Sequence, residues 1–405
     1  MSELFRNRYV RAILLSGLFL QIGIWVRNFA ILLFVMEQTN GDAFAVSMIS
    51  VAEYAPIFLF SFLAGTFADR WRPKRTMVWC EILSAVSVLL VLLTFVFGTW
   101  KAVFFATLIS AILSQFSQPS GMKLFKLHVP AEQLQTGMSA YQTLFALFMV
   151  LGPILGTFVF QALGLEIAMV ITAVAFLCAA AVLYLLPPDP VEEKSTEKKT
   201  VILEEMASGL RYVKSNRVLT LLGFCFAGAG LGLGLVQPLG IFLVTERLGL
   251  PKESLQWLLM VQGIGMITGG ALAMAFAKSV APQKLLVIGM LGNAIALSVS
   301  GISTMQWLTL SANLLSGLLL PCIQIGINTI IMKYTEGAFI GRVNGILTPL
   351  FTGSMVLTMS AAGKMKEYFS LLTIYQTSAV LFLIGMMFIV PLIRSAEVQI
   401  PQKSN

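Results

Sequence analysis

The sequence predicts an all-α membrane protein of twelve transmembrane helices, arranged as two pseudo-symmetric six-helix bundles with both termini in the cytoplasm. Composition gives the first reason. Apolar residues make up 57% of the 405-residue chain and charged residues only 11%, whereas soluble domains carry about 25% charged residues. Long apolar runs and an uneven distribution of lysine and arginine give the second and third. The composition excludes a soluble enzyme, a nucleic-acid binder and a disordered scaffold.

A helix needs about 20 mostly apolar residues to cross the hydrocarbon core of a bilayer. The apolar runs reach this length and lack strict alternation of apolar and polar residues, so they indicate helices and exclude a β-barrel. The expected spans, in chain order, are residues 9–35, 43–67, 75–97, 101–121, 134–160, 166–186, 217–244, 254–276, 284–302, 306–332, 341–363 and 370–394.

Lysine and arginine set the expected orientation. Of the 27 basic residues, 21 fall at the chain ends, in the even-numbered connections and between the halves. Five fall in the odd-numbered connections, and Arg27 lies inside a predicted helix. Since cytoplasmic loops carry the excess of basic residues, both termini are expected in the cytoplasm. The net charge of +8 then reflects topology and lipid contact, so no nucleic-acid partner is expected.

A polar, proline-containing stretch divides the chain. We expect a six-helix bundle over residues 1–186, a cytoplasmic linker over 187–216, a second six-helix bundle over 217–394 and a cytoplasmic tail over 395–405. In the linker, residues 201–215 repeat apolar side chains at helical spacing, which predicts an amphipathic helix on the membrane surface.

The two halves match when the sequence is shifted by 209 residues. The shift places Asn7 on Asn216 and Gly23 on Gly232 without a gap. Common apolar composition does not explain matched polar residues at loops, so an internal repeat is predicted. Two similar rigid bundles around a central site can rock and expose that site to each side of the membrane in turn.

The connection between the second and third spans carries the strongest motif. Residues 65–75 read Gly-Thr-Phe-Ala-Asp-Arg-Trp-Arg-Pro-Lys-Arg, which is similar to the signature loop G-x-x-x-D-R-x-x-R-R/K of the major facilitator superfamily. The resemblance implies a latch in which Asp69 contacts the other half and holds the outward-open state. A solvated charge run that only fixes topology is the alternative. The residues assigned to the latch are Gly65, Asp69, Arg70, Arg72, Lys74, Arg75 and Glu81.

The latch departs from the family pattern in two ways. Pro73 stands where the pattern usually has arginine, and Lys278 occupies the place of Asp69 in the second half. Only the first-half loop is therefore expected to act as an acidic latch. Glu81 is expected to be a partner of the loop arginines.

The fifth span adds a second likeness. Gly152, Pro153 and Gly156 resemble the core of the motif associated with antiporters. They suggest a hinge, because proline frees a backbone carbonyl and permits a bend; plain helix packing is the alternative. Residues 118–134, echoed by residues 341–345, resemble the drug-efflux branch that contains macrolide exporters and the enterobactin exporter.

Arg27 and Glu53 are the clearest ionisable residues deep within the predicted spans. They lie at similar depths on consecutive helices, so they are able to pair. An unpaired charge at that depth costs about 3 kcal/mol or more. One interpretation is a structural ion pair. The other is a proton-coupling or substrate site, since the charge of Glu53 would change with its exposure to water.

By the resemblance, spans from both halves line a central substrate cavity. Uncharged polar, aromatic and methionine side chains there suit lipophilic or amphipathic solutes. The candidate lining residues are Gln21, Trp25, Asn28, Gln115, Tyr141, Phe145, Met149, Gln237, Gln262, Gln324 and Asn328. For each aromatic residue, ordinary packing or lipid contact is the alternative.

The function expected is secondary active export of hydrophobic or amphipathic small molecules, drug-like or macrolide-like, by alternating access with proton antiport. No GxxxxGK[ST] motif is present, so ATP is not expected to drive transport directly. The alternatives are a siderophore or metabolite exporter, a lipid flippase, and a non-transporting membrane receptor. We expect a monomer in the bacterial cytoplasmic membrane, no enzyme activity, and no cofactor or metal. Its partners would be a lipophilic solute, protons and the bilayer.

Overall fold

The computed structural model describes residues 7–95, 101–187, 202–276 and 280–393 of the chain. Within these ranges no strand occurs, and nearly every residue is helical. Contacts divide the chain into two compact units. Unit 1 comprises Met1–Thr196 with Leu255–Met260, and unit 2 comprises Glu197–Ser254 with Val261–Asn405. The boundaries expected for the bundles, the linker and the tail stay predictions.

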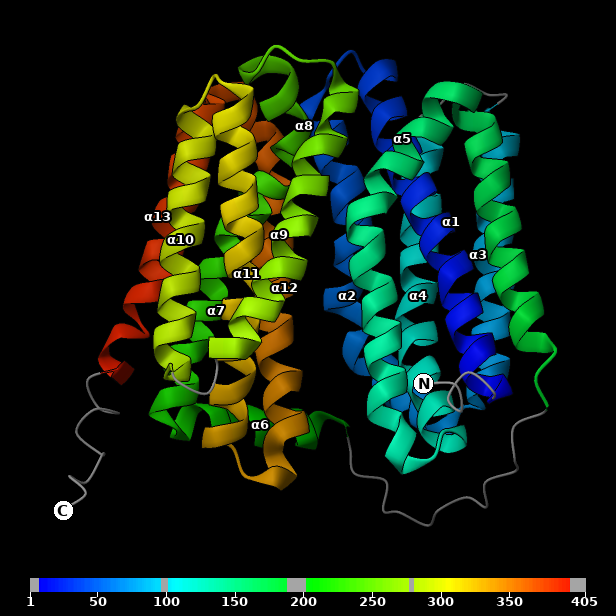
Figure 1. The fold of residues 1–405 in the computed structure, drawn as a ribbon, viewed down its shortest axis with the longest axis horizontal. Helices are drawn as coiled ribbons and strands as arrows, with labels where there is room; N and C mark the ends of the chain where they lie inside the picture. Colours follow the sequence, from blue (N-terminus) through cyan, green and yellow to red (C-terminus); the bar gives the residue numbers. More distant parts are fainter. Residues whose placement is uncertain (1–6, 96–100, 188–201, 277–279, 394–405) are drawn as a thin grey trace. The chain divides into compact units, whose positions relative to one another are not determined.

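Unit 1 consists mainly of five helices that run side by side along a common direction (Figure 1). They are α1 (Arg8–Gln38), α2 (Ala43–Arg70), α3 (Pro73–Phe95), α4 (Lys101–His128) and α5 (Ala131–Tyr184). The 54 residues of α5 are interrupted at Gly164, which has φ 76° and ψ 177°. This break falls between the predicted spans 134–160 and 166–186, so α5 contains both of them.

Unit 2 holds the remaining helices. They are α6 (Ile202–Ser215), α7 (Arg217–Val236), η2 (Gln237–Leu239), α8 (Gly240–Phe242), η3 (Leu243–Arg247), η4 (Lys252–Ser254), α9 (Leu255–Phe276), α10 (Pro282–Ile302), α11 (Gln306–Tyr334), η5 (Gly337–Phe339), α12 (Ile340–Tyr368) and α13 (Leu371–Met387). The first residues of α9 belong to unit 1 by their contacts. Eleven helical segments of the described chain are long and apolar enough to cross a membrane. Counting α5 as two spans confirms the twelve predicted.

One predicted span is less regular than the sequence indicates. The apolar run over residues 217–244 predicts one continuous helix, but the helix changes pitch after Val236. Pro238 lies in a short 3-10 turn there, and a wider π turn follows at Leu243–Arg247. Proline has no N–H to donate to the preceding turn of an α-helix, which accounts for the change.

Matching contacts at the start of α1 and α7 confirm the internal repeat. Asn7 accepts a hydrogen bond from the N–H of Tyr9 and donates one to the carbonyl of His128, the last residue of α4, at 3.1 Å. Asn216 caps α7 in the same way and donates to the carbonyl of Tyr334, the last residue of α11, at 3.1 Å. An asparagine side chain thus joins two helix ends in each unit.

A second pair of contacts lies deeper in the two units. The carbonyl of Gly23 accepts a hydrogen bond from the hydroxyl of Thr172 at 3.4 Å. The carbonyl of Gly232 accepts one from the hydroxyl of Ser378 at 2.7 Å. Both glycines are buried, and the shift of 209 residues relates them. The close approach of the first helix to the last is therefore built alike in both units.

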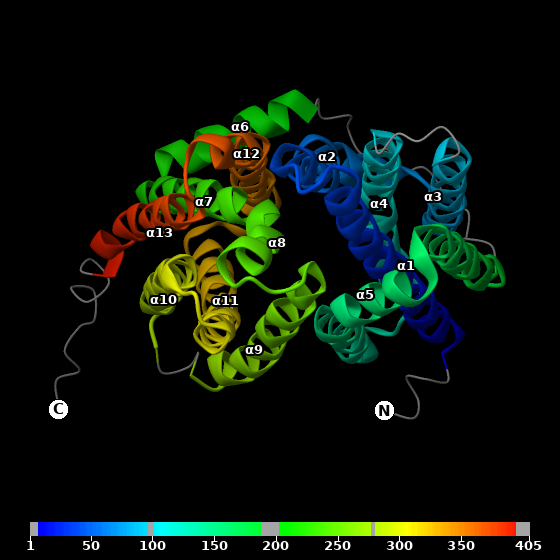
Figure 2. The ribbon, with the colours of Figure 1, turned by 90° about the horizontal axis from the view of Figure 1, so that it is seen from above.

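Helix α6 forms within the segment expected to be amphipathic. It lies across the ends of α7 and α12 (Figure 2). The ring of Tyr212 stacks on Phe339 with centroids 4.4 Å apart, and its hydroxyl accepts a hydrogen bond from the N–H of Glu336 at 3.1 Å. Met206 and Leu210 on α6 are exposed. That this helix rests on the membrane surface stays a prediction.

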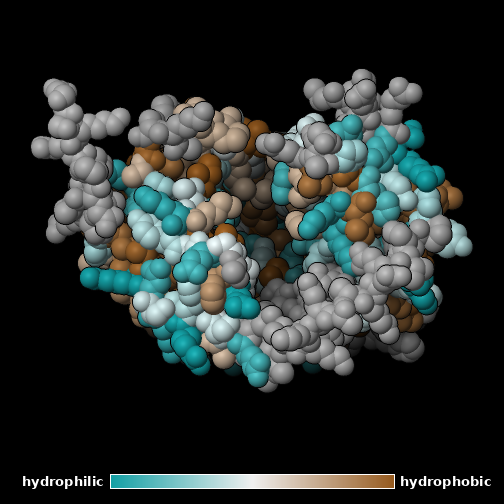
Figure 3. Space-filling view, turned by 90° about the horizontal axis from the view of Figure 1, so that it is seen from below, coloured by the Kyte–Doolittle hydropathy of each residue, from teal (hydrophilic) through white to brown (hydrophobic). Residues whose placement is uncertain are grey.

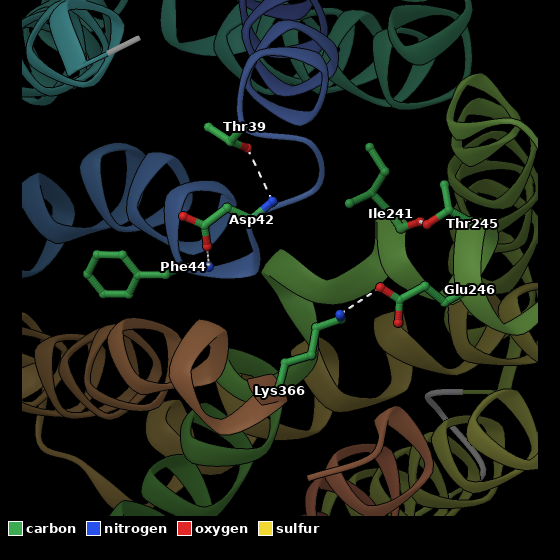
Figure 4. Close-up of polar contacts among 7 residues, drawn as sticks. All are labelled: Thr39, Asp42, Phe44, Ile241, Thr245, Glu246 and Lys366. Atoms are coloured by element: carbon green, nitrogen blue, oxygen red, sulfur yellow. Dashed lines mark hydrogen bonds and ion pairs between the residues drawn. The ribbon is translucent and has the colours of Figure 1, made fainter. Parts of the chain in front are cut away.

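Polar contacts close the helix ends in both units (Figure 4). In unit 2, Lys366 donates to Glu246 at 2.6 Å and lies over the ring of Phe242, 4.4 Å from its centroid. In unit 1, the carboxylate of Asp42 accepts a hydrogen bond from the N–H of Phe44 at 2.8 Å. Such contacts satisfy backbone and charged groups that the helices leave open.

At the other helix ends, where α1 and α7 begin, Figure 3 shows hydrophilic side chains mixed with apolar ones on each unit. Basic side chains are exposed there, including Arg11 and Lys126 in unit 1 and Arg211 and Lys214 in unit 2. The cytoplasmic placement of this side stays a prediction from the charge distribution.

The break in α5 generates a stability prediction. The dihedral angles of Gly164 are open essentially to glycine alone. No atom lies within 4 Å of the position that a Cβ would take. We expect Gly164→Ala to lower the free energy of unfolding by about 1–3 kcal/mol through backbone strain, measured by thermal unfolding in detergent.

Gly270→Ala is the matched control for Gly164→Ala. A Cβ at Gly270 would also have no atom within 4 Å, but this residue lies inside α9. Because alanine favours a helix, this variant should be as stable as the parent protein or more stable. Equal stability of both variants would contradict the role of Gly164 as the break between two spans.

Candidate functional site

Four polar side chains form a network that joins α1, α2 and α4 within unit 1. Arg27 is buried, with 4% of its surface exposed. Its Nε and Nη2 donate to Oδ1 of Asn28 at 3.1 and 2.9 Å, and its Nη1 donates to the hydroxyl of Ser110. Nδ2 of Asn28 donates to Oε1 of Glu53 at 2.7 Å. We call these four residues the polar network.

Asn28 is the link between the two charged groups of the network. The sequence predicts that Arg27 and Glu53 are able to pair, and it places Asn28 in the substrate cavity. In the structure the Asn28 amide accepts from the guanidinium and donates to the carboxylate at the same time. Hydrogen bonds to ionised groups are the strong ones, so this amide stabilises both charges. Among the described residues no cluster of histidine, cysteine, aspartate or glutamate is suited to a metal ion.

The signature loop is described only in part. Helix α2 includes Gly65, Asp69 and Arg70, but their side chains lie outside the described part of the chain. Lys74 donates from its Nζ to the carbonyl of Tyr184 at 2.9 Å and to that of Leu186. The start of α3 is thereby tied to the end of α5.

Glu81 is directed into unit 1. It is buried, with 4% of its surface exposed, and Oε1 accepts a hydrogen bond from the hydroxyl of Ser117 on α4 at 2.7 Å. Arg72 and Arg75 are exposed. Glu81 thus contacts α4 from the buried face of α3. Because the side chain of Arg70 lies outside the described part of the chain, the pairing of Glu81 with the loop arginines stays a prediction.

Unit 1 also contains a cavity of about 250 Å³. We call it the unit 1 cavity. Residues of α1, α3, α4 and α5 line it, and they include Tyr141 and Phe145, two of the predicted substrate-binding residues. The rings of Tyr141 and Phe145 lie 5.5 Å apart. Ser117, which donates to Glu81, is also part of the wall.

The glycines of the fifth span pack against α1. A Cβ added at Gly152 would lie 2.3 Å from the ring of Trp25, and one at Gly156 would lie 2.6 Å from the carbonyl oxygen of Trp25. Pro153 between them is buried. These contacts supply the helix packing that was the alternative interpretation of the motif; whether the segment also bends during transport stays a prediction.

The other candidates for the substrate cavity have varied surroundings. In unit 1, Gln21 is buried in α1, and Gln115 and Met149 are half-buried in α4 and α5. In unit 2, Gln262 is half-buried, and the other three candidates are exposed. These three are Gln237, Gln324 and Asn328.

Sequence reasoning missed the serines. Ser110 and Ser117, both on α4, contact the charged side chains of Arg27 and Glu81 on other helices. The buried Ser16 of α1 lines the unit 1 cavity. A signal was present, since Ser110, Ser114 and Ser117 recur at helical spacing within one predicted span. Hydroxyls at that spacing lie on one helix face and can hydrogen-bond across helices in an apolar medium.

The bridge through Asn28 can be tested by its removal. Asn28→Leu keeps the approximate volume but leaves Arg27 and Glu53 without their common partner. We expect the free energy of unfolding to fall by about 1.5–3 kcal/mol, the cost of losing hydrogen bonds to charged groups. Asn313→Leu is the matched control, because Asn313 donates only to the carbonyl of Thr309 in its own helix. Equal losses in both variants, measured by thermal unfolding, would remove the bridging role.

Known proteins share this fold along most of the chain. The solved nucleoside transporter NupG aligns with a TM-score of 0.74 at 13% identity and covers 96% of this chain and 99% of its own. A POT family transporter in complex with 5-aminolevulinic acid aligns with a TM-score of 0.76 at 12% identity and covers 97% of both chains.

Sequence relatives are bacterial transporters. The MFS-type transporter YkuC of Bacillus subtilis is 23% identical over 368 residues, which are 88% of this chain and 85% of YkuC. The multidrug efflux pump Tap of Mycolicibacterium fortuitum is 29% identical over 242 residues, 57% of this chain and 58% of Tap. Residues 13–251 match the family model described as Major Facilitator Superfamily, which is more than half of the chain. The chain therefore belongs to the Major Facilitator Superfamily of membrane transporters.

Proposed function

We propose that this transporter exports hydrophobic or amphipathic small molecules by alternating access, driven by proton antiport. The observation that carries the proposal is the polar network, which holds a carboxylate and a guanidinium within spanning helices. Ionisable residues inside a membrane are expensive and mark functional sites. Export of drug-like solutes is supported by the relatives named multidrug efflux pump Tap.

The network offers a physical basis for coupling. With both groups ionised, the charges of Arg27 and Glu53 balance; a proton on Glu53 leaves a net charge of +1. If the two orientations of the transporter solvate that charge differently, the proton shifts the equilibrium between them. Each charge that crosses the membrane down its potential supplies about 2.3 kcal/mol per 100 mV. The repeat-related residue in unit 2 is Gln262, so the acid occurs in one half only.

The bacterial relatives support a place in the cytoplasmic membrane. With the basic side of the helices inward, both termini lie in the cytoplasm. A monomer with one lipophilic solute and protons as its partners is the simplest form of this proposal.

Glu53→Gln tests the coupling. In vesicles that hold the purified protein, we expect the accumulation of ethidium driven by an imposed pH gradient to fall at least tenfold, because the amide cannot bind and release the proton. Exchange of ethidium without a gradient should continue, since the cavity is kept. The same measurement with a neutral macrolide checks that the loss of gradient-driven accumulation does not depend on the charge of the solute.

Glu246→Gln is the control for this test, because it removes a carboxylate that is exposed and pairs with Lys366 outside the polar network. Full gradient-driven transport by Glu53→Gln would exclude Glu53 from the coupling. Movement of fluorescent lipid without any gradient, in place of solute transport, would favour a flippase.

The latch is tested through Asp69. We expect Asp69→Asn to lower the transport rate at least tenfold while membrane insertion stays at the parent level, because the latch needs a negative charge to contact a helix N-terminus. Asp42→Asn is the control; it also removes one carboxylate, but asparagine caps the start of α2 as well as aspartate does. Parent transport rates in Asp69→Asn would leave the loop as a topological charge run.

A further inference from the structure

The unit 1 cavity contains a hydroxyl without a partner. Ser16 is buried, with 1% of its surface exposed, and lines the cavity. Among the described residues its Oγ has no hydrogen-bond partner, not even a carbonyl of its own helix. Buried polar groups normally have a partner, and leaving one without costs about 1–3 kcal/mol. An unpaired hydroxyl in the wall of a cavity points to a polar occupant of that cavity.

Ser117 gives the cavity a preference for donors over acceptors. Its hydroxyl donates to Oε1 of Glu81 at 2.7 Å. A serine hydroxyl has one proton and two lone pairs, so a hydroxyl that donates to a carboxylate offers only lone pairs to other groups. Ser117 lines the cavity, and it therefore favours a ligand that donates a hydrogen bond.

Glu81 places a buried carboxyl group behind this wall. Its carboxylate is buried and its hydrogen-bond partner Ser117 is neutral. A cation in the cavity would be attracted across a short, poorly solvated path, where charges interact more strongly than in water.

The remaining wall suits an organic cation. Three methionines, Met77, Met122 and Met138, line the cavity with polarisable thioethers. Tyr141 and Phe145 provide aromatic faces, which attract cations within about 6 Å. None of the fourteen described residues that line the cavity carries a formal charge. Gln118 and Gln142 add neutral amides, and a strongly hydrated metal ion would find no carboxylate among these residues.

We propose that the unit 1 cavity is a binding site for the ammonium end of an amphipathic molecule, with Ser117 and Glu81 recognising the charge and Ser16 accepting a second N–H. The site lies wholly within unit 1. The inference rests on the proposed transport of amphipathic solutes, and it adds the charge class of the ligand. Two sources provide this chemistry: a solute in transit and the headgroup of an aminophospholipid.

Binding of two matched probes to the full-length protein in detergent tests the proposal. The first is N-methyl-1-naphthylmethylamine, which carries two N–H groups and a positive charge at pH 7. The second is the neutral 1-naphthylmethyl methyl ether of similar size. By equilibrium dialysis we expect Glu81→Gln to weaken binding of the amine at least tenfold and to leave binding of the ether within twofold.

Glu246→Gln is the matched control, because Glu246 pairs with Lys366, which does not line the cavity, whereas Glu81 accepts a hydrogen bond from the lining residue Ser117. Amine affinity that is unchanged in Glu81→Gln would overturn the proposed recognition of charge. Because no gradient is applied, this result is separate from the test of Glu53. Loss of coupling and loss of amine binding are therefore distinguishable failures.

Gly121→Leu provides a variant that does not depend on the folding of Glu81→Gln. Gly121 lines the cavity, and a Cβ added there would lie 3.3 Å from the terminal methyl of Met77. The far end of a methionine can move, so the leucine should fill the cavity while the helices stay in place. We expect binding of both probes to fall at least tenfold. Unchanged binding would place the amine outside the unit 1 cavity.

Nanodiscs distinguish the two sources of the ammonium group. In discs of phosphatidylethanolamine, a headgroup that occupies the cavity should compete with the naphthyl amine and raise its apparent Kd at least fivefold over discs of phosphatidylglycerol. A rise of this size in the parent protein supports the site with a lipid occupant. Equal Kd values in both discs, with the Glu81 effect retained, support the site with a solute occupant.

Discussion

Hydrocarbon offers no partner to a backbone N–H or carbonyl, and this constraint governs the whole structure. It leaves long helices as the means of crossing the membrane for such a sequence. It also determines where the helices are interrupted or change pitch. Gly164 interrupts α5 between two spans, and the turn at Pro238 appears where an amide proton is missing. Most buried polar side chains of the described residues are held by one another, by helix ends or by the backbone of their own helix, and Ser16 is an exception.

The fold was largely predictable from the sequence because this constraint acts on composition and length. Apolar runs marked every span, and the break at Gly164 falls where two runs were separated. The repeat was also visible, since Asn7 and Asn216 must match to make the same contact in each unit. The span predicted over 217–244 was confirmed, but the change of helix pitch at Pro238 was not predicted, because it follows from the missing N–H of proline and not from the apolar run.

The candidate site was less predictable because it depends on which helix faces which. Arg27 and Glu53 were identified as charged residues inside the spans, yet the amide of Asn28 between them follows only from the packing of α1 on α2. Glu81 was assigned to the loop by its nearness in sequence, and its hydrogen bond with Ser117 on α4 follows only from the packing of α3 on α4. Serines in an apolar helix give a weak signal, because many hydroxyls in such helices bond to their own backbone, as that of Thr107 does.

The contacts of the asparagines have a consequence for how the two halves diverged. In each bundle one asparagine joins the corresponding two helix ends, so this part of the frame is the same in both halves. The carboxylate of Glu53 has no counterpart, since Gln262 stands at its place. A duplicated ancestor that kept its scaffold in both copies was free to carry a carboxylate in one copy and a neutral amide at the same place in the other.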